Sequence, residues 1–367
     1  MTWDVVVVGA GPAGASAALA AVSRGARTLL LERATLPRYK RCGGGLIGAA
    51  CGALPPGFEL SGLTRDVVGR VGFTKLGSHG YTRSAEPFLP MVMRSEFDAA
   101  LVDRAQQAGV ELRTGTTVRG YVAEHGGVRL LTESGSFLTP VAIGADGSAS
   151  RAAAAVGVRY DQVDLGLEAE LPAPKGADWS GTARLDWGPV PGSYGWVFPK
   201  GDRLTAGVIG PRAAAPALGA YFTEFLRRLG LDRASAHEDG GHLTRVRAPG
   251  SPLRSGGLLV AGDAAGLLDP WTREGISFAL RSGALAGAAA AGDLDRDEAE
   301  VATCLGPEIV AGRAALEVFR RHPGTVHTVL RAAPGMWPLF VRLVSGQTDL
   351  PAQLGRRRGK ALVRLLG

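Results

Sequence analysis

The sequence predicts an α/β fold in which a nucleotide-binding domain, assembled from separate segments, carries an inserted antiparallel β-sheet and a helical C-terminus. Residues 3–32 have the pattern of a strand, a glycine-rich turn, a helix and a second strand. Residues 158–248 are rich in strand-like segments, and the pattern of the first kind returns at 257–290. The order of these segments predicts a sheet-rich domain inserted between parts of the first.

The first unit carries a dinucleotide-binding motif. The β-branched run 3–8 ends in GAGPAG, and the next strand-like run ends in Glu32. Gly9 permits the turn, Gly11 lets the backbone approach a pyrophosphate, and Gly14 lets the helix pack on the strand. The helix N-terminus offers free N–H groups to phosphates, and Glu32 can accept hydrogen bonds from an adenosine ribose. This context favours cofactor binding over glycines that serve packing alone.

The later elements follow from turn signals and hydrophobic patterns. Residues 65–93 are predicted as turn-punctuated strands, followed by a helix with Ser95 as its N-cap. Residues 111–134 are typical of a hairpin, and 141–151 of a buried strand that runs into an alanine-rich helix. One helix interrupts the strand-rich part near 215–230, and the chain after 300 is predicted to be helical.

These elements give the predicted domain boundaries. The nucleotide-binding domain takes 1–70, 94–157 and 250–300, and the substrate-binding sheet domain takes 71–93 and 158–249. The C-terminal helical region is 301–367.

Composition restricts the class of protein. A hydrophobic content of 46% with 20% charged residues is typical of a packed globular chain. The net charge of +7 fits an anionic cofactor, a membrane surface or simply a solvated basic surface, and we expect no nucleic-acid partner. No run approaches the roughly 20 apolar residues of a spanning helix. The three cysteines lack metal or disulfide spacing, which predicts a reduced, cytoplasmic protein, with peripheral membrane contact left open.

Three separated motifs together resemble the flavoproteins of the p-hydroxybenzoate hydroxylase fold. They are GAGPAG with Glu32, ADGSAS at 145–150 and GDAAGLLDP at 262–270. The resemblance implies an FAD-binding Rossmann-like domain of the glutathione reductase/p-hydroxybenzoate hydroxylase type. It implies that Asp263 bonds the ribityl chain, that Arg94 lies along the cofactor, and that the helix beginning near Gly275 aims its positive end at the flavin.

The stretch PRYKRCGGGL at 37–46 resembles the PxxKxCGGG segment of the geranylgeranyl reductase family, whose members saturate C=C bonds in prenyl chains. The aromatic run Tyr194-x-Trp196-x-Phe198, followed by Gly207 and Gly210, is similar to that family's substrate-domain signature. One departure stands in the loop DPWTREGI, where the family often has a smaller residue and a glycine; Trp271 and Arg273 could reshape the pocket there.

The motifs and these resemblances together give the candidate site residues. The cofactor candidates are Gly9, Gly11, Pro12, Ala13, Gly14, Glu32, Arg33, Lys40, Cys42, Gly43, Arg94, Asp146, Gly262, Asp263, Gly275 and Ile276. The catalytic candidates are Cys42, Gly44 and Gly45, and the substrate candidates are Tyr194, Trp196, Phe198 and Trp271. We expect no metal, since His237 and His242 beside Glu238 and Asp239 lack a further ligand motif and fit a polar loop.

The expected reaction is hydride transfer from flavin N5 to an unactivated alkene with protonation of the other carbon, so positioning and a well-placed acid matter most. Cys42 is either a participant beside the flavin or a small, inert buried residue. The alternating aromatic trio is either a wall for a prenyl chain or sheet core. The cations Arg38, Lys40 and Arg41 hold a diphosphate or head group, contact the flavin pyrophosphate, or form a solvated loop. The run RRRGK at 356–360 lies on an anionic bilayer or is a basic tail.

Only one complete dinucleotide fingerprint is present, so the electron donor is expected to be transient: NAD(P)H, a ferredoxin or a reduced deazaflavin. The substrate is expected to be a prenyl lipid or prenyl diphosphate. The alternatives are an aromatic monooxygenase on the same fold, a redox-neutral prenyl cyclase or isomerase, and a flavin-bound binding protein without turnover.

Overall fold

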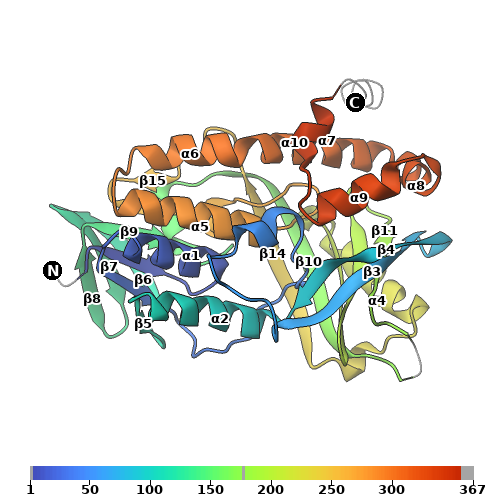
Figure 1. Cartoon of the computed structure of the whole chain (residues 1–367), viewed down its shortest axis with the longest axis horizontal. Coiled ribbons are helices and arrows are strands. Elements are labelled where there is room, and N and C mark those ends of the chain that lie inside the picture. Colours follow the sequence, from blue (N-terminus) through green and yellow to red (C-terminus); the bar gives the residue numbers. More distant parts are fainter. Residues whose placement is uncertain (1–2, 176–177, 357–367) are drawn as a thin grey trace.

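The computed structural model describes residues 3–175 and 178–356 and contains two large sheets beneath a layer of helices (Figure 1). The first sheet has six strands in the order β15-β16-β9-β1-β2-β5. All its neighbours are parallel except the edge pair β15–β16. The strands are β1 (Val5–Val8), β2 (Thr28–Leu31), β5 (Glu111–Arg113), β9 (Val141–Gly144), β15 (Arg254–Ser255) and β16 (Leu258–Val260).

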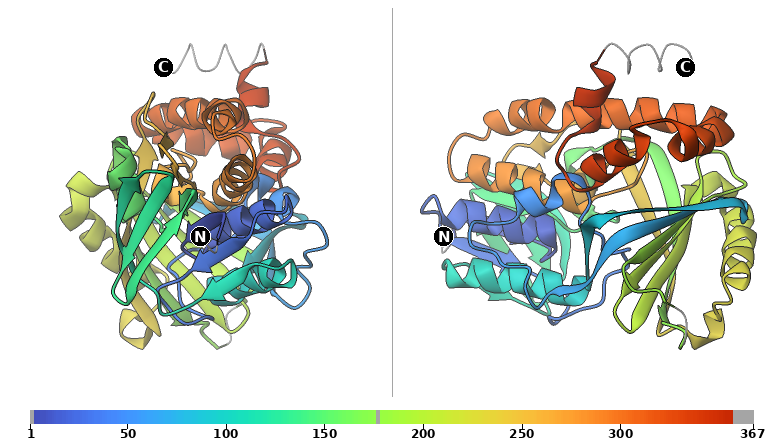
Figure 2. Two further views of the ribbon diagram at one scale, coloured as in Figure 1. Left: turned by 90° about the vertical axis from the view of Figure 1, so that its left-hand side faces the viewer. Right: turned by 45° about the vertical axis from the view of Figure 1, so that its right-hand side comes forward.

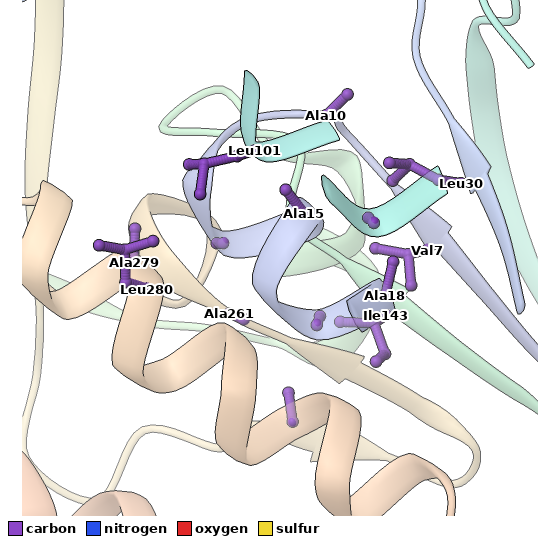
Figure 3. Close-up of a cluster of buried hydrophobic side chains, with 14 of the residues drawn as sticks. Val7, Ala10, Ala15, Ala18, Leu30, Leu101, Ile143, Ala261, Ala279 and Leu280 are labelled. Atoms are coloured by element: carbon purple, nitrogen blue, oxygen red, sulfur yellow. The ribbon is translucent and has the colours of Figure 1, made fainter. Parts of the chain in front are cut away.

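The central strands of this sheet, β1, β9 and β16, are short, buried apolar runs that need cover on both faces. Helices α1 (Pro12–Val22), α2 (Arg94–Gln107) and α5 (Ile276–Ala290) pack on one side, with the alanine and leucine side chains of Figure 3 between them. The small residues of α1 and α5 let their backbones touch: a Cβ added at Gly283 would lie 2.1 Å from the carbonyl oxygen of Ala13. The helix that follows the GD motif is thereby fixed against the glycine-rich turn.

The second sheet has seven strands in the order β14-β10-β13-β12-β11-β3-β4. One face is covered by α4 (Ala215–Arg228), and the other face turns toward the first sheet and the C-terminal helices (Figure 2). The strands are β3 (Thr64–Lys75), β4 (Ser78–Val92), β10 (Tyr160–Pro172), β11 (Thr182–Trp187), β12 (Tyr194–Lys200), β13 (Arg203–Pro211) and β14 (Glu238–Arg247). Side chains of alternate residues therefore belong either to the α4 core or to the inner face.

Three details differ from what the sequence predicts. The predicted N-cap Ser95 is wrong: α2 begins at Arg94 after Met93, and no side chain caps it, because Arg94 turns inward onto Asp98. The predicted hairpin is part of a separate three-stranded sheet of β6 (Val118–Glu124), β7 (Gly127–Thr132) and β8 (Gly135–Thr139). The second sheet begins at Thr64, inside the segment assigned to the first domain, because β3 pairs with β4 along its whole length.

The C-terminal region is helical, as predicted, up to the last described residue. Helices α6 (Arg296–Cys304) and α7 (Gly306–Arg321) lie over α5, and α8 (Pro323–Ala332), α9 (Met336–Val344) and α10 (Leu350–Leu354) follow (Figures 1 and 2). The indole N–H of Trp337 in α9 donates to the carbonyl oxygen of Ser84 at 2.7 Å, which ties this layer to β4. A short 3₁₀ helix (Gly48–Ala53) and an alanine-rich helix α3 (Arg151–Val156) complete the elements near the first sheet. Within the described residues, no helix is both long and apolar enough to cross a bilayer.

Candidate active site

A cavity of about 1480 Å³ lies between the two sheets and beneath the C-terminal helices. The candidate residues from every motif meet here: all of them line the cavity except Gly14 and Gly262. Those two glycines stand behind its wall, Gly14 against the backbone of Gly9 and Gly262 against the side chain of Ala13. The C-terminal region also contributes, from Glu308 in α7 to Arg356, which the sequence did not predict.

The glycine-rich turn is shaped by backbone contact. Gly9 has φ +102°, and a Cβ there would lie 2.3 Å from the carbonyl oxygen of Ala145 in the second motif. A Cβ at Gly14 would lie only 1.7 Å from the carbonyl oxygen of Gly9. The Glu32 carboxylate accepts from the backbone N–H of Ala10 at 2.8 Å and of Ala34 at 3.0 Å. Glu32 therefore holds the turn as well as facing the cavity.

Two further motifs complete a cradle for a dinucleotide. Asp146 accepts from the backbone N–H of Arg151 at 2.9 Å and holds the turn before α3 open toward the cavity. Asp263 lines the cavity beside Gly275, where a Cβ would come within 3.1 Å of Asp263 Oδ1. The first turns of α1 and of α5 both lie at the cavity wall. No side chain caps α1, so its N–H groups and dipole are available to anionic groups of a ligand. In α5 the Glu274 carboxylate accepts from the backbone N–H of Ser277 at 2.7 Å, so part of that helix end is already occupied.

Arg94 belongs to a buried ionic network. Its Nε lies 2.8 Å from Asp98 Oδ1, and Asp98 Oδ2 is 3.1 Å from Nη1 of Arg38, which also approaches Glu32. Burial opposes the charge of Arg94, but Asp98 and the side-chain hydrogen bond with Cys42 raise its pKa, so the guanidinium stays charged beside the thiol. Arg38 is thereby engaged in holding the loop, which removes it from the cations free to bind a substrate head group.

The CGGG loop lies across the inner face of the second sheet. The backbone N–H of Cys42 donates to Glu168 Oε1 at 2.8 Å, and Lys200 Nζ donates to the carbonyl oxygen of Cys42 at 3.2 Å. Gly44 has φ +77°, and a Cβ there would lie 2.2 Å from the carbonyl oxygen of Val92. A Cβ at Gly43 would meet the ring of Phe198 at 2.8 Å. Two buried charged side chains and two glycine positions therefore fix the half-buried Cys42 at the cavity wall.

Sequence analysis missed Glu168 and Lys200. Glu168 is 1% exposed and Lys200 is 3% exposed, and Lys200 Nζ also pairs with Glu170 Oε1 at 2.9 Å. Burial raises the pKa of Glu168 to about 7, although Lys200 opposes the shift. Within the part of the chain that the structure describes, Glu168 Oε2 has no hydrogen-bond partner. The available signal was the pair of acids at 168 and 170 inside the otherwise apolar segment 165–172, since buried carboxylates need partners.

The raised pKa of Glu168 gives a testable pH dependence. A carboxyl group whose pKa rises on folding binds protons more tightly in the native state, so its contribution to stability is lost as pH rises from about 4.5 to 7. Glu168→Gln removes this titration while the amide oxygen still accepts from Cys42. As pH rises across this interval, the free energy of unfolding of the variant, measured relative to that of the wild type, should therefore increase by up to about 3 kcal/mol.

Urea unfolding of both proteins at a series of pH values measures this difference. Glu238→Gln is the matched control, because that side chain stands at the start of β14 and is only half-buried. A constant difference between Glu168→Gln and wild type over the interval would mean that Glu168 is already ionised at acidic pH.

The aromatic trio forms part of the cavity wall. Tyr194, Trp196 and Phe198 alternate along β12, face the same side and all line the cavity. The indole of Trp196 lies over Gly207, where a Cβ would come within 2.4 Å of its ring. The Tyr194 hydroxyl donates to the carbonyl oxygen of Thr272, so the trio is joined to the loop that carries Trp271. The glycine after the aromatic run therefore has a packing reason, which is to leave room for the indole.

The polar residues of the expected loop at 237–239 belong to β14 and its start rather than to a metal site. His242 lines the cavity, and burial, with Lys40 and Arg41 nearby, lowers its pKa to about 4. Across residues 3–175 and 178–356, no cluster of three histidine, cysteine or acidic side chains could hold a metal ion.

Comparison with known proteins agrees with this geometry. Residues 4–163 match the family of FAD-dependent oxidoreductases. The chain is 32% identical to the digeranylgeranylglycerophospholipid reductase of Methanocaldococcus jannaschii, over 78% of this chain and 76% of that one. It is 28% identical to the geranylgeranyl diphosphate reductase of Rhodobacter capsulatus, over 90% of this chain and 83% of that one.

Solved structures show the same fold. A geranylgeranyl bacteriochlorophyll reductase-like protein from Thermoplasma acidophilum aligns over 99% of this chain and 98% of its own, with a TM-score of 0.76 and 20% identity. A flavin-dependent brominase aligns over 99% of both chains, with a TM-score of 0.74 and 17% identity. At these identities the likeness concerns the fold.

The glycine-rich turn, the GD motif, the open N-terminus of α1 and the family match make this chain an FAD-dependent oxidoreductase. The cradle fits FAD because the close backbone contacts at Gly9 and Gly14 leave the uncapped N-terminus of α1 open to a pyrophosphate. Within this class, the chain belongs to the geranylgeranyl reductase family.

Proposed function

We propose that this enzyme uses FAD to saturate C=C bonds in the prenyl chain of a prenyl lipid or prenyl diphosphate. The observation that supports this most strongly is a continuous series of aromatic rings along the cavity. The ring centroid of Trp271, in the loop before α5, lies 6.0 Å from that of Phe319. The ring centroids of Phe319 and Trp187 lie 5.0 Å apart. Trp187 lies 6.1 Å from Phe73, which lies 5.6 Å from Phe340 in α9.

This series suits an extended isoprenoid. Trp271, Trp187 and Phe340 line the cavity itself, whereas Phe73 and Phe319 are fully buried behind them. Rings and aliphatic side chains bind a long apolar chain without a polar code, by removing its surface from water. The relatives named for digeranylgeranylglycerophospholipid and geranylgeranyl diphosphate support the same class of substrate.

The chain's own residues position the alkene and deliver the proton to it. When bound, the reduced flavin supplies a hydride equivalent. Glu168 and Lys200 hold the backbone of Cys42 at the cavity wall, and its thiol contacts the charged Arg94. The group that delivers the proton must stand at a fixed distance from the alkene, and the clamped Cys42 is the candidate for it.

The head group of the substrate has fewer partners than the sequence suggested. Arg38 is engaged by Asp98, and an Arg41 N–H donates to the carbonyl oxygen of Asp239. Lys40 and Arg41 both line the cavity and are the cations of the three that can bind an anionic head group. We propose a transient electron donor, NAD(P)H, a ferredoxin or a reduced deazaflavin, because one dinucleotide turn is present and FAD fills it. Contact with a membrane surface stays a proposal, since most of the basic run at 356–360 lies outside the described residues.

Cys42→Ser tests the role of the thiol. The serine hydroxyl is smaller and far less acidic than a thiol, so we expect bound FAD to be unchanged and alkene reduction to slow by at least about 100-fold. The measurement is the rate at which the anaerobically reduced enzyme is reoxidised by a geranylgeranyl lipid, followed by the flavin absorbance. Cys51→Ser, in the short helix after the loop and exposed, is the matched control. Equal rates for Cys42→Ser and wild type would remove Cys42 from the reaction.

The same reoxidation assay tests the function. A geranylgeranyl lipid should reoxidise the reduced flavin, and its saturated phytanyl counterpart should not. Reoxidation by oxygen only, with stoichiometric consumption of NAD(P)H and an aromatic substrate, would instead indicate a monooxygenase. Conversion of the lipid to an isomer of equal mass, with the flavin still reduced, would indicate a redox-neutral cyclase or isomerase.

A further inference from the structure

Arg273 stands at a backbone position that favours glycine. It lies in the loop between Asp269 and α5 and has φ +58°, a left-handed conformation that L side chains rarely adopt. A non-glycine residue keeps such a conformation only where its surroundings enforce it. The arginine side chain is nevertheless only 2% exposed, so it fills a defined space inside the protein.

The side chain is held on several sides. Its Nε lies 3.0 Å from Asp164 Oδ2 in β10, and its Nη1 donates to the carbonyl oxygen of Trp271 at 2.5 Å. Its guanidinium carbon lies 5.8 Å from the centroid of the Tyr194 ring. The amide of Gln162 donates to the same Asp164 oxygen at 2.7 Å and to the carbonyl oxygen of Pro270 at 2.8 Å. Arg273 thus closes the space between the loop before α5 and the first half of β10.

This space separates two cavities. The large cavity that receives FAD has Tyr194, Trp271 and Arg273 in its wall. A second cavity of about 380 Å³ lies beyond, between β10, the turn at 191–192 and α7. Exposed residues at its rim, including Asp161, Pro191 and Arg320, open it to solvent. Arg273 lines both cavities, and the other residues of the second cavity do not line the first.

We propose that Arg273 is the partition between the FAD cavity and this polar surface pocket, and that it keeps water and polar solutes from reaching the flavin by this route. The inference depends on FAD binding and does not depend on the proposed reduction of prenyl chains. Exclusion of solvent protects a reduced cofactor from side reactions and strengthens the electrostatic interactions inside the site. A glycine at 273 would satisfy the backbone and leave a channel in place of the side chain.

Solute access to bound FAD tests this partition. Arg273→Gly leaves Asp164 without its ion partner, so Arg273→Gly/Asp164→Asn is prepared beside it to remove the unpaired buried charge. Arg320→Ala is the matched control, because this exposed arginine lines only the second cavity. Two readouts are used: quenching of FAD fluorescence by acrylamide, and anaerobic oxidation of the dithionite-reduced flavin by ferricyanide.

The expected result is an increase of about tenfold or more in both the quenching constant and the ferricyanide rate for the two Arg273 variants, with Arg320→Ala within twofold of wild type. Unchanged access in Arg273 variants that retain FAD would overturn the proposal and leave the partition to Tyr194 and Trp271. Loss of FAD from both Arg273 variants, at unchanged thermal stability, would also overturn it, because Arg273 would then be a cofactor-binding residue.

Discussion

Gly14→Ala is expected to be purified without flavin and to lose several kcal/mol of stability. The added Cβ would lie 1.7 Å from the carbonyl oxygen of Gly9 and 2.9 Å from its carbonyl carbon, and both neighbours are backbone atoms that cannot turn aside. Either α1 moves away from β1, or the turn flattens and withdraws the N–H groups that face the pyrophosphate. The affinity for FAD should fall by at least about 100-fold, since each 1.4 kcal/mol of lost interaction is tenfold in the dissociation constant.

Isothermal titration of the apoprotein with FAD measures this affinity, and thermal unfolding measures the stability. Gly219→Ala is the control, because that glycine lies in α4 and has no atom within 4 Å of the added Cβ. This control should gain up to about 1 kcal/mol through helix propensity alone. Normal FAD affinity in a folded Gly14→Ala protein would mean that α1 tolerates displacement and that the turn does not bind the pyrophosphate.

Lys200→Met is expected to destabilise the protein by about 3–5 kcal/mol. The Lys200 and Glu170 side chains are 1% and 2% exposed and pair at 2.9 Å, so removal of the ammonium leaves a buried carboxylate without its partner. The same substitution releases the carbonyl oxygen of Cys42, and the rate of alkene reduction should fall together with the stability.

A double-mutant cycle separates these two effects. Lys200→Met/Glu170→Gln should recover most of the stability in urea unfolding, because no unpaired charge remains buried. It should not recover the rate, because Cys42 still lacks the bond to its carbonyl oxygen. Recovery of both would mean that Lys200 acts on the ion pair alone and has no part in fixing the CGGG loop.

The strands of the first sheet and the glycine-rich turn could be predicted from local sequence patterns. The βαβ unit, the strand before Asp146 and the GD strand are each short apolar runs with a turn signal, and periodicity and glycine spacing identify such units within one segment of chain. The motif residues that follow these strands are brought together because the carboxyl ends of parallel strands lie at one edge of the sheet. The candidate cofactor residues could therefore be named before the structure was known.

The polar contacts of the CGGG loop could not be predicted in this way. Glu168 and Lys200 reach Cys42 from strands more than a hundred residues away, and their meeting depends on the register of β10 and β12 with β13 between them. A register shift of one residue would turn both side chains toward α4. The series of aromatic rings could not be predicted for the same reason. Phe319 and Phe340 belong to helices whose sequence shows an apolar face but not the surface that this face covers.

The most direct test of the proposed reaction is the mass of the lipid product. The FAD-loaded enzyme is reduced anaerobically with dithionite, supplied with a digeranylgeranylglycerophospholipid, and the extracted lipid is analysed by mass spectrometry. We expect the lipid to gain mass in steps of two hydrogen atoms, and Cys42→Ser to slow the first step. An unchanged lipid mass with a reoxidised flavin, or a product that has gained an oxygen atom, would contradict it.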